Sequence, residues 1–229
     1  MNTLKNSIAA LVLLLTANVF AQTPEVEFDT YAESKQNASK YLLADDVAMR
    51  DCPSTYCEKL TTIRIGTNVR LLEKTEEAQE LNGITSRWYK VKMGPQEGWI
   101  WGGLISQKTF VSQANAEVRF VFGEAGYNSD DEKQFQLRAV KNGVELDKMI
   151  IASDSLHYAN VQNIGNEGMK NVDDIIVLNT ITDSCEVEGK SLYILWKNNK
   201  LEKTNNLIAS VESLSSEDCC YLFYSEIKE

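Results

Sequence analysis

The sequence is poor in histidine, because His157 is the only one among 229 residues. Serine and cysteine nucleophiles need a positioned base, which is most often a histidine. In the C-terminal half His157 precedes Cys185, which is the wrong order for a cysteine peptidase whose histidine follows its nucleophile. The residues around His157 also form no nucleophile motif. We therefore expect no catalytic residues, and we interpret His157 as a structural or surface residue.

The sequence also has no clustered run of lysine or arginine. It contains 23 basic and 33 acidic residues, which give a formal net charge of −10. Nucleic acids and anionic lipid surfaces attract basic patches, so the sequence argues against both as partners. Carboxylates are plentiful instead, and a hydrolase that works through a pair of carboxylates stays open.

Metal-ligand spacing is missing as well. Cys185, Cys219 and Cys220 could be combined with His157 in a zinc site, but no C-x-x-C pair occurs. The acidic segment 128–132 could offer oxygens to calcium, yet it lacks the glycine and the later glutamate of a standard calcium loop. We interpret that segment as a solvated hairpin tip, and we expect no metal and no cofactor.

Long apolar runs are absent beyond the N-terminus. Residues 1–21 combine Lys5, an apolar run at 8–15 and a small-residue ending at Ala21, which is the pattern of a secretory signal peptide. A retained anchor is the alternative, but a membrane span needs roughly 20 apolar residues. No cysteine follows Ala21 to carry a lipid anchor. We expect an exported protein, periplasmic or secreted, that does not span the membrane after cleavage.

Residues 22–40 are polar and irregular, and they predict a leader before the first domain. Within them Asn37, Ala38 and Ser39 fit the acceptor pattern for N-glycosylation. We interpret these three residues as a solvated loop, and whether Asn37 is modified stays open.

The rest of the chain has the pattern of an all-β protein. Aromatic and β-branched residues recur in short runs separated by Asn, Gly, Asp and Ser, and no long segment keeps a helical period. Between residues 41 and 106 this pattern predicts five or six short strands, a charged loop at 75–85 and a tight Gly-Pro turn at 94–97. Strands this short suit a small closed barrel.

Four motifs in this segment resemble those of bacterial SH3-like domains, which are small barrels often attached to exported cell-wall proteins. In order, they are Val-Ala-Met-Arg at 47–50, Gly-Thr-Asn-Val at 66–69, Trp-Tyr-Lys-Val at 88–91 and Gly-Trp-Ile at 98–100. The resemblance covers residues 41–106 and implies a barrel that binds a peptide, a cell-wall fragment or a partner protein. An acidic insertion around Glu76 departs from the family's pattern, so the ligand is not carried over.

The aromatic residues of this segment have two interpretations. Trp88 and Tyr89 face opposite sides of one expected strand, and one of these sides must fill the barrel. The other side could form a groove for an extended peptide or for cell-wall peptide and glycan. We hypothesise that Tyr56, Trp88, Tyr89 and Trp101 contribute to such a groove. Core packing is the alternative for the last three, and it is favoured for Trp99.

Five cysteines in an exported chain predict disulfides. Cys52 and Cys57 bracket a four-residue turn, and we expect a bridge between them. Cys185 is expected to pair with Cys219 or Cys220, because adjacent cysteines seldom pair with each other. Which of the two it takes stays open.

After an expected linker at 107–116, residues 117–229 contain a weak internal repeat. Each copy consists of a strand, a polar loop, a strand, an Asn-rich turn and a strand, and the copies are offset by about 56 residues. The three strands are expected at 118–122, 135–140 and 149–153 in the first copy, and at 174–178, 192–196 and 207–210 in the second. We expect a second β domain of packed meanders, sandwich-like or propeller-like, with a final strand at 220–224.

These interpretations predict an exported, non-catalytic binding module of the bacterial cell envelope. Its expected partner is a cell-wall peptide, a glycan or an envelope protein. The first alternative is an accessory part of a carboxylate-based cell-wall hydrolase, or such a hydrolase itself. The second is a periplasmic inhibitor or folding partner. The sequence leaves the ligand and the oligomeric state open.

Overall fold

The computed structural model describes residues 26–27, 33–34, 36–152, 159–180 and 191–204. The expected signal peptide, His157, Cys185, Cys219, Cys220 and the expected strand at 220–224 lie outside these residues. Apart from one turn of 3-10 helix, all regular secondary structure in the described residues is strand, so the all-β prediction is confirmed. The strands form four antiparallel sheets, the smallest of which pairs β1 (Val26–Glu27) with β2 (Glu33–Ser34).

The first large sheet is a curled, barrel-like sheet of six strands in the order β3-β6-β7-β8-β4-β5. Its strands are β3 (Ser39–Tyr41), β4 (Val47–Arg50), β5 (Lys59–Ile63), β6 (Asn68–Leu81), β7 (Ile84–Met93) and β8 (Gln96–Trp101). A single turn of 3-10 helix, η1 (Gly102–Leu104), follows β8. Alternate residues of these strands point inward and fill a small apolar core. That core contains Leu42, Val47, Met49, Ile63, Val69, Leu71, Tyr89, Val91, Ile100 and Ile105.

The second half of the chain forms two further sheets of four strands each. The first sheet runs in the order β12-β11-β10-β9 and contains β9 (Lys108–Val111), β10 (Val118–Tyr127), β11 (Lys133–Lys141) and β12 (Val144–Ala152). The second sheet runs β13-β14-β15-β16 and contains β13 (Ala159–Asn163), β14 (Asp174–Thr180), β15 (Ser191–Lys197) and β16 (Lys200–Thr204). β9 lies inside the span 107–116 that the sequence suggested as a linker. It is a strand because residues 108–111 pair with residues 119–122 of β10.

The two sheets pack face to face as a sandwich around one apolar core. This core contains Val118, Phe120, Phe122, Phe135, Leu137, Ala139 and Ile151 from the first sheet, and Val161, Ile176, Leu178, Ile194, Trp196 and Leu201 from the second. At its centre the rings of Phe120 and Trp196 meet edge to face with their centroids 5.5 Å apart. Such aromatic pairs stabilise a core beyond the area that they bury.

The first two strands of each repeat copy are β10 and β11, and β14 and β15, while the third strand of the second copy, expected at 207–210, lies outside the described residues. With β12 and β16 they form two meanders, β10–β11–β12 and β14–β15–β16. Each contains a two-residue turn in which both residues have positive φ. These φ values are 51° and 75° at Asn142 and Gly143, and 51° and 58° at Asn198 and Asn199. This backbone matches the twist of the strands that it joins, and asparagine and glycine adopt it at low cost.

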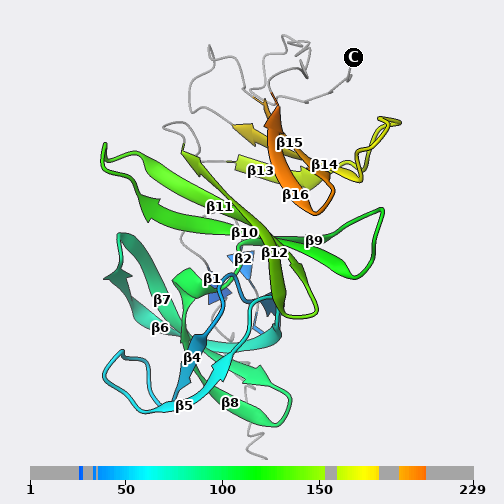
Figure 1. Cartoon of the computed structure of the whole chain (residues 1–229). Helices are drawn as coiled ribbons and strands as arrows, with labels where there is room; N and C mark the ends of the chain where they lie inside the picture. Colours follow the sequence, from blue (N-terminus) through cyan, green and yellow to red (C-terminus); the bar gives the residue numbers. More distant parts are fainter. Residues whose placement is uncertain (1–25, 28–32, 35, 153–158, 181–190, 205–229) are drawn as a thin grey trace, which may run out of the picture.

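The barrel-like sheet packs on the outer face of the first meander (Figure 1). Leu43 and Ile65 from the barrel side meet Val121 of β10 and Val140 of β11 in a small cluster, all of them buried. A Cβ on Gly123 would lie 2.5 Å from the Leu43 side chain, so β10 needs a glycine where this leucine packs. Figure 1 therefore shows three layers, with the β9–β12 sheet between the barrel and the β13–β16 sheet.

Candidate functional site

The residues predicted as a charged loop at 75–85 form a hairpin, which corrects that prediction. β6 and β7 continue to pair out to Leu81 and Ile84, and the turn between them is Asn82 (φ 53°) and Gly83 (φ 73°). The pairing shifts between Lys74 and Ala78. An Asn-Gly pair flanked by apolar residues is the strongest short-range hairpin signal, and it could have identified this turn from the sequence.

A second hairpin, formed by β10 and β11, lies beside the first. Its tip at 128–132 is held by Asn128, whose Oδ1 accepts hydrogen bonds from the backbone N–H groups of Asp130 (2.9 Å) and Glu132 (2.8 Å). Its Nδ2 donates to Glu132 Oε2 at 2.6 Å. These hydrogen bonds are all made within the tip, which agrees with the interpretation of 128–132 as a hairpin tip.

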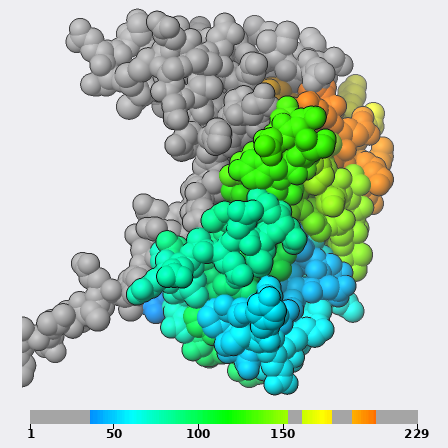
Figure 2. All heavy atoms as spheres, turned by 90° about the vertical axis from the view of Figure 1, so that its left-hand side faces the viewer, coloured from blue at the N-terminus to red at the C-terminus, as the bar shows by residue number. Residues whose placement is uncertain are grey.

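The two hairpins meet through close backbone contact. A Cβ on Gly126 (φ 88°) would lie 2.9 Å from the carbonyl oxygen of Asn82. A Cβ on Gly83 would lie 3.6 Å from the ring of Tyr127. No side chain separates the two hairpins at this point, so the backbone contact itself sets the distance between the barrel and the sandwich. Figure 2 shows the same neighbourhood from outside, with the blue-green β6–β7 region bordering on the green of the following strands.

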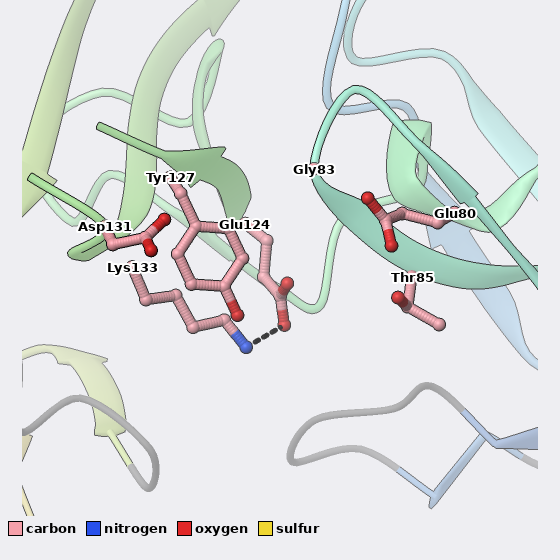
Figure 3. Close-up of a pocket in the computed structure, with 7 residues that line it drawn as sticks. All are labelled: Glu80, Gly83, Thr85, Glu124, Tyr127, Asp131 and Lys133. Carbon is pink, nitrogen blue, oxygen red and sulfur yellow. Dashed lines mark ion pairs between the residues drawn. The ribbon is translucent and has the colours of Figure 1, made fainter. Parts of the chain in front are cut away.

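A pocket of about 540 Å³ opens between these hairpins (Figure 3). It is lined by Glu80, Gly83 and Thr85 of the barrel hairpin, and by Glu124, Tyr127, Asp131 and Lys133 of the sandwich hairpin. A cavity of this size is in the range of small-ligand sites. We call it the junction pocket.

One ion pair lies within the junction pocket. Lys133 Nζ is 2.8 Å from Glu124 Oε1, and these two side chains are only 17% and 11% exposed. The same oxygen of Glu124 accepts a hydrogen bond from Gln107 Nε2 at 3.4 Å. Glu80, Asp131 and Tyr127, by contrast, are exposed. A smaller cavity of about 20 Å³ adjoins the pocket, because Thr85 and Glu124 line both.

The hypothesised groove residues lie in different surroundings. Tyr89 is fully buried in the barrel core, Trp88 and Trp101 are 4% and 5% exposed, and Tyr56 is 98% exposed. Of the four, only Tyr56 presents a full ring to solvent. Trp99, for which core packing was favoured, is half-buried on the face of β8 opposite the core residue Ile100. The groove remains a hypothesis, and three of its four side chains are covered.

The two buried indoles stabilise the wall of the junction pocket. Trp88 and Trp101 are paired across β7 and β8. Trp88 Nε1 donates to Gln79 Oε1 at 2.7 Å, and Trp101 Nε1 donates to the Gln79 carbonyl oxygen at 3.3 Å. Gln79 directly precedes the pocket residue Glu80 in β6. The indoles therefore anchor the extended part of the hairpin instead of leaving it free in solvent.

Tyr56 lies on a loop between β4 and β5 whose cysteines, Cys52 and Cys57, are at disulfide-bonding distance, with Cα atoms 5.6 Å apart. Arg50 Nη1 donates to the Cys57 carbonyl oxygen at 2.6 Å and fixes the loop to β4. Asp51 also lies within reach of both sulfurs, and these three form the one group of metal-type ligands found in the described part of the chain. Sulfurs bonded to each other are not available to a metal, since it is the thiolate that binds.

Residues 45–106 match the family model of the bacterial SH3 domain. The segment is similar to a bacterial SH3 domain, and we refer to it below as the SH3 domain. The match confirms the resemblance, and it spans the strands from β4 to β8 together with η1. The SH3 domain therefore contributes the barrel wall of the junction pocket, and the strands that follow it contribute the other wall. No curated protein and no solved structure matches the chain. Across the residues that the structure describes, no helix is long and apolar enough to cross a membrane.

Proposed function

We propose that the protein is an exported, non-catalytic binding module of the cell envelope, and that it holds its ligand in the junction pocket. A bacterial SH3 domain suggests a cell-wall binding module, and such domains are often found in exported proteins. Both points support this assignment. The expected ligand is a peptide or a peptidoglycan fragment.

The observation that supports this proposal is the junction pocket. Its two walls come from the SH3 domain and from the sandwich, and the Gly126–Asn82 contact holds them together. A ligand in such a pocket contacts a preformed surface, so little free energy is lost in ordering the protein. Tyr56, on its closed loop, is a second and separate candidate for ligand contact.

The proposal is tested by retention on purified peptidoglycan. Thr85 is an exposed residue of β7 that lines the pocket, so Thr85→Trp should fill the pocket without disturbing a core. Thr62→Trp, at an exposed position of β5 outside the pocket, is the matched control. We expect the wild-type protein and Thr62→Trp to be retained and Thr85→Trp to be lost from the pellet. Tyr56→Ala shows whether retention depends on the second candidate surface. If wild-type protein stays in the supernatant, the proposal fails.

The carboxylates of Glu80, Glu124 and Asp131 around one pocket favour a second candidate, a carboxylate-based cell-wall hydrolase. The retained protein is therefore incubated with the peptidoglycan, and soluble fragments are measured. Retention without release supports the binding module. Release that disappears in Glu80→Gln would instead assign a hydrolase.

A further inference from the structure

The charges around the junction pocket do not balance. Its lining contains three carboxylates and one ammonium group. The ammonium group of Lys133 is already paired with Glu124, in an arrangement that is largely shielded from solvent. Glu80 on the barrel wall and Asp131 on the sandwich wall form no ion pair with any described residue. The pocket therefore presents two negative charges that none of the described residues neutralises.

Tyr127 is an independent feature that indicates the same ligand chemistry. Its ring is 54% exposed although it is held beside Gly83 at the junction of the two hairpins. Figure 3 shows this ring between Asp131 and Glu124, across the pocket from Glu80 and Thr85. The face of an aromatic ring attracts cations through its quadrupole. A tyrosine beside the carboxylate of Asp131, which forms no ion pair with a described residue, thus offers a cation both a π face and a charged acceptor.

Other ligand classes fit this lining less well. An anion would meet three carboxylates and a lysine whose charge is already compensated. A wholly apolar ligand would cover charged groups without giving them partners, which costs free energy. An ammonium group can donate up to three hydrogen bonds, and carboxylates are its strongest acceptors.

We propose that the junction pocket binds a primary ammonium group carried by a peptide, either on a side chain or at a free amino end. Asp131 accepts its hydrogen bonds beside the ring face of Tyr127, and Glu80 on the opposite wall adds negative charge to the pocket. The inference rests on the proposed function, because it names the ligand class of the same pocket. The two hairpins bring one carboxylate each, so a ligand must lie between the SH3 domain and the sandwich.

The test measures binding of small probes by calorimetry. One probe is the capped tripeptide acetyl-Gly-Lys-Gly-amide, and the other is the same peptide with its lysine Nε acetylated. Glucosamine and N-acetylglucosamine form a parallel pair that distinguishes a peptide amine from a sugar amine. We expect the free-amine peptide to bind, and acetylation to weaken its binding at least about tenfold, because a charge-assisted hydrogen bond is lost. Binding should also weaken as salt is added.

A pair of double variants decides whether these two carboxylates are responsible. Glu80→Gln with Asp131→Asn should weaken peptide binding at least about tenfold. Glu76→Gln with Asp130→Asn removes the same charge from exposed positions outside the pocket lining, and it should leave binding within about twofold, because screened surface charges contribute little. Equal binding of both peptides, equal effects of both double variants, preference for glucosamine over the peptide, or no binding of any probe would overturn the inference. Retention on peptidoglycan is scored separately, so a protein that is retained but ignores the amine refutes this inference and leaves the proposed function standing.

Discussion

The two meanders of the sandwich share one pattern along the chain but differ in what covers their outer faces. In the first meander, Val121 and Val140 point outward and pack against Leu43 and Ile65 of the SH3 side. In the second, the outward residues include Ile175, Val177, Tyr193 and Leu195, and they pack with Val172, Ile164 and Met169 of the connection between β13 and β14. The inner faces resemble each other, since both contribute to the same core.

A one-residue difference in register accompanies this contrast. Counted from the Asn-containing turn, Val140 of β11 and Trp196 of β15 occupy the same position, yet Val140 faces outward and Trp196 faces the core. Because side chains alternate along a strand, a shift of one residue exchanges the two faces. The two meanders have similar sequence patterns, yet the outer face of the first packs against the barrel side and the outer face of the second is covered by the connection between β13 and β14.

The largest effect should come from the inner face that both meanders share. Phe120→Ala removes the ring that meets Trp196, and we expect a loss of about 3–5 kcal/mol in the free energy of unfolding. Val121→Ala, one residue further along β10, empties only part of the outer contact and should cost about 1.5–3 kcal/mol. Urea denaturation measures both. Equal losses, or a larger loss for Val121→Ala, would show that the barrel contact is as important as the sandwich core.

A buried polar cluster joins the two sheets of the sandwich and should give the next largest effect. Asp174, at the start of β14, is fully buried. Its carboxylate accepts hydrogen bonds from Ser112 Oγ, from the backbone N–H of Gln113 (2.7 Å) and from Asn163 Nδ2 (2.8 Å). Asp174→Ala removes the acceptor of three hydrogen-bond donors, so we expect a loss of about 2–3 kcal/mol in the free energy of unfolding.

Ser112→Ala serves as the graded comparison for this cluster. It removes one donor to the carboxylate and also the acceptor of the Asn115 backbone N–H (3.0 Å), while the other two donors stay bonded. A smaller loss of about 1–2 kcal/mol is therefore expected in the same denaturation experiment. If Asp174→Ala cost no more than Ser112→Ala, the carboxylate would not be what connects the two sheets.

The sequence predicts some of these features and not others, for physical reasons. The strands around Tyr89 and Ile100 follow from inward apolar residues at every second position. The β6–β7 hairpin lacks that signal, because residues 76–80 are exposed whichever way they point. Only Asn82-Gly83 indicates the reversal there. The junction pocket needs two hairpins that are remote in the sequence, and no local pattern reports their contact.

The burial of Trp88 and Trp101 also depends on a contact that no local sequence pattern predicts. Alternation correctly places Trp88 on the face of β7 opposite Tyr89 and Val91. That face would be solvent-exposed in an isolated sheet. Here Gln79 of the extended β6 accepts hydrogen bonds from both indoles, so the residues that resembled a groove support the pocket wall.

A last prediction tests the contact between the barrel and the first meander through pH. Lys40 in β3 donates to the carbonyl oxygen of Gln107 at 3.4 Å, where the barrel meets the sandwich. Burial, and then the charge of Lys108, lower the pKa of Lys40 from 10.5 to about 8. Between about pH 8 and 10.5 the unfolded chain therefore keeps a proton that the folded protein has released, and the free energy of unfolding should rise with pH across this window.

Lys40→Met should remove this rise and should make the protein more stable below pH 8, where the wild type must hold a partly desolvated charge. Thermal unfolding at several pH values measures the difference between variant and wild type, so that other titrating groups cancel. Lys148→Met, at an exposed position of β12, controls for the loss of one lysine. If the difference between Lys40→Met and wild type stays constant from pH 7 to 10.5, the desolvation of Lys40 at the barrel contact is disproved.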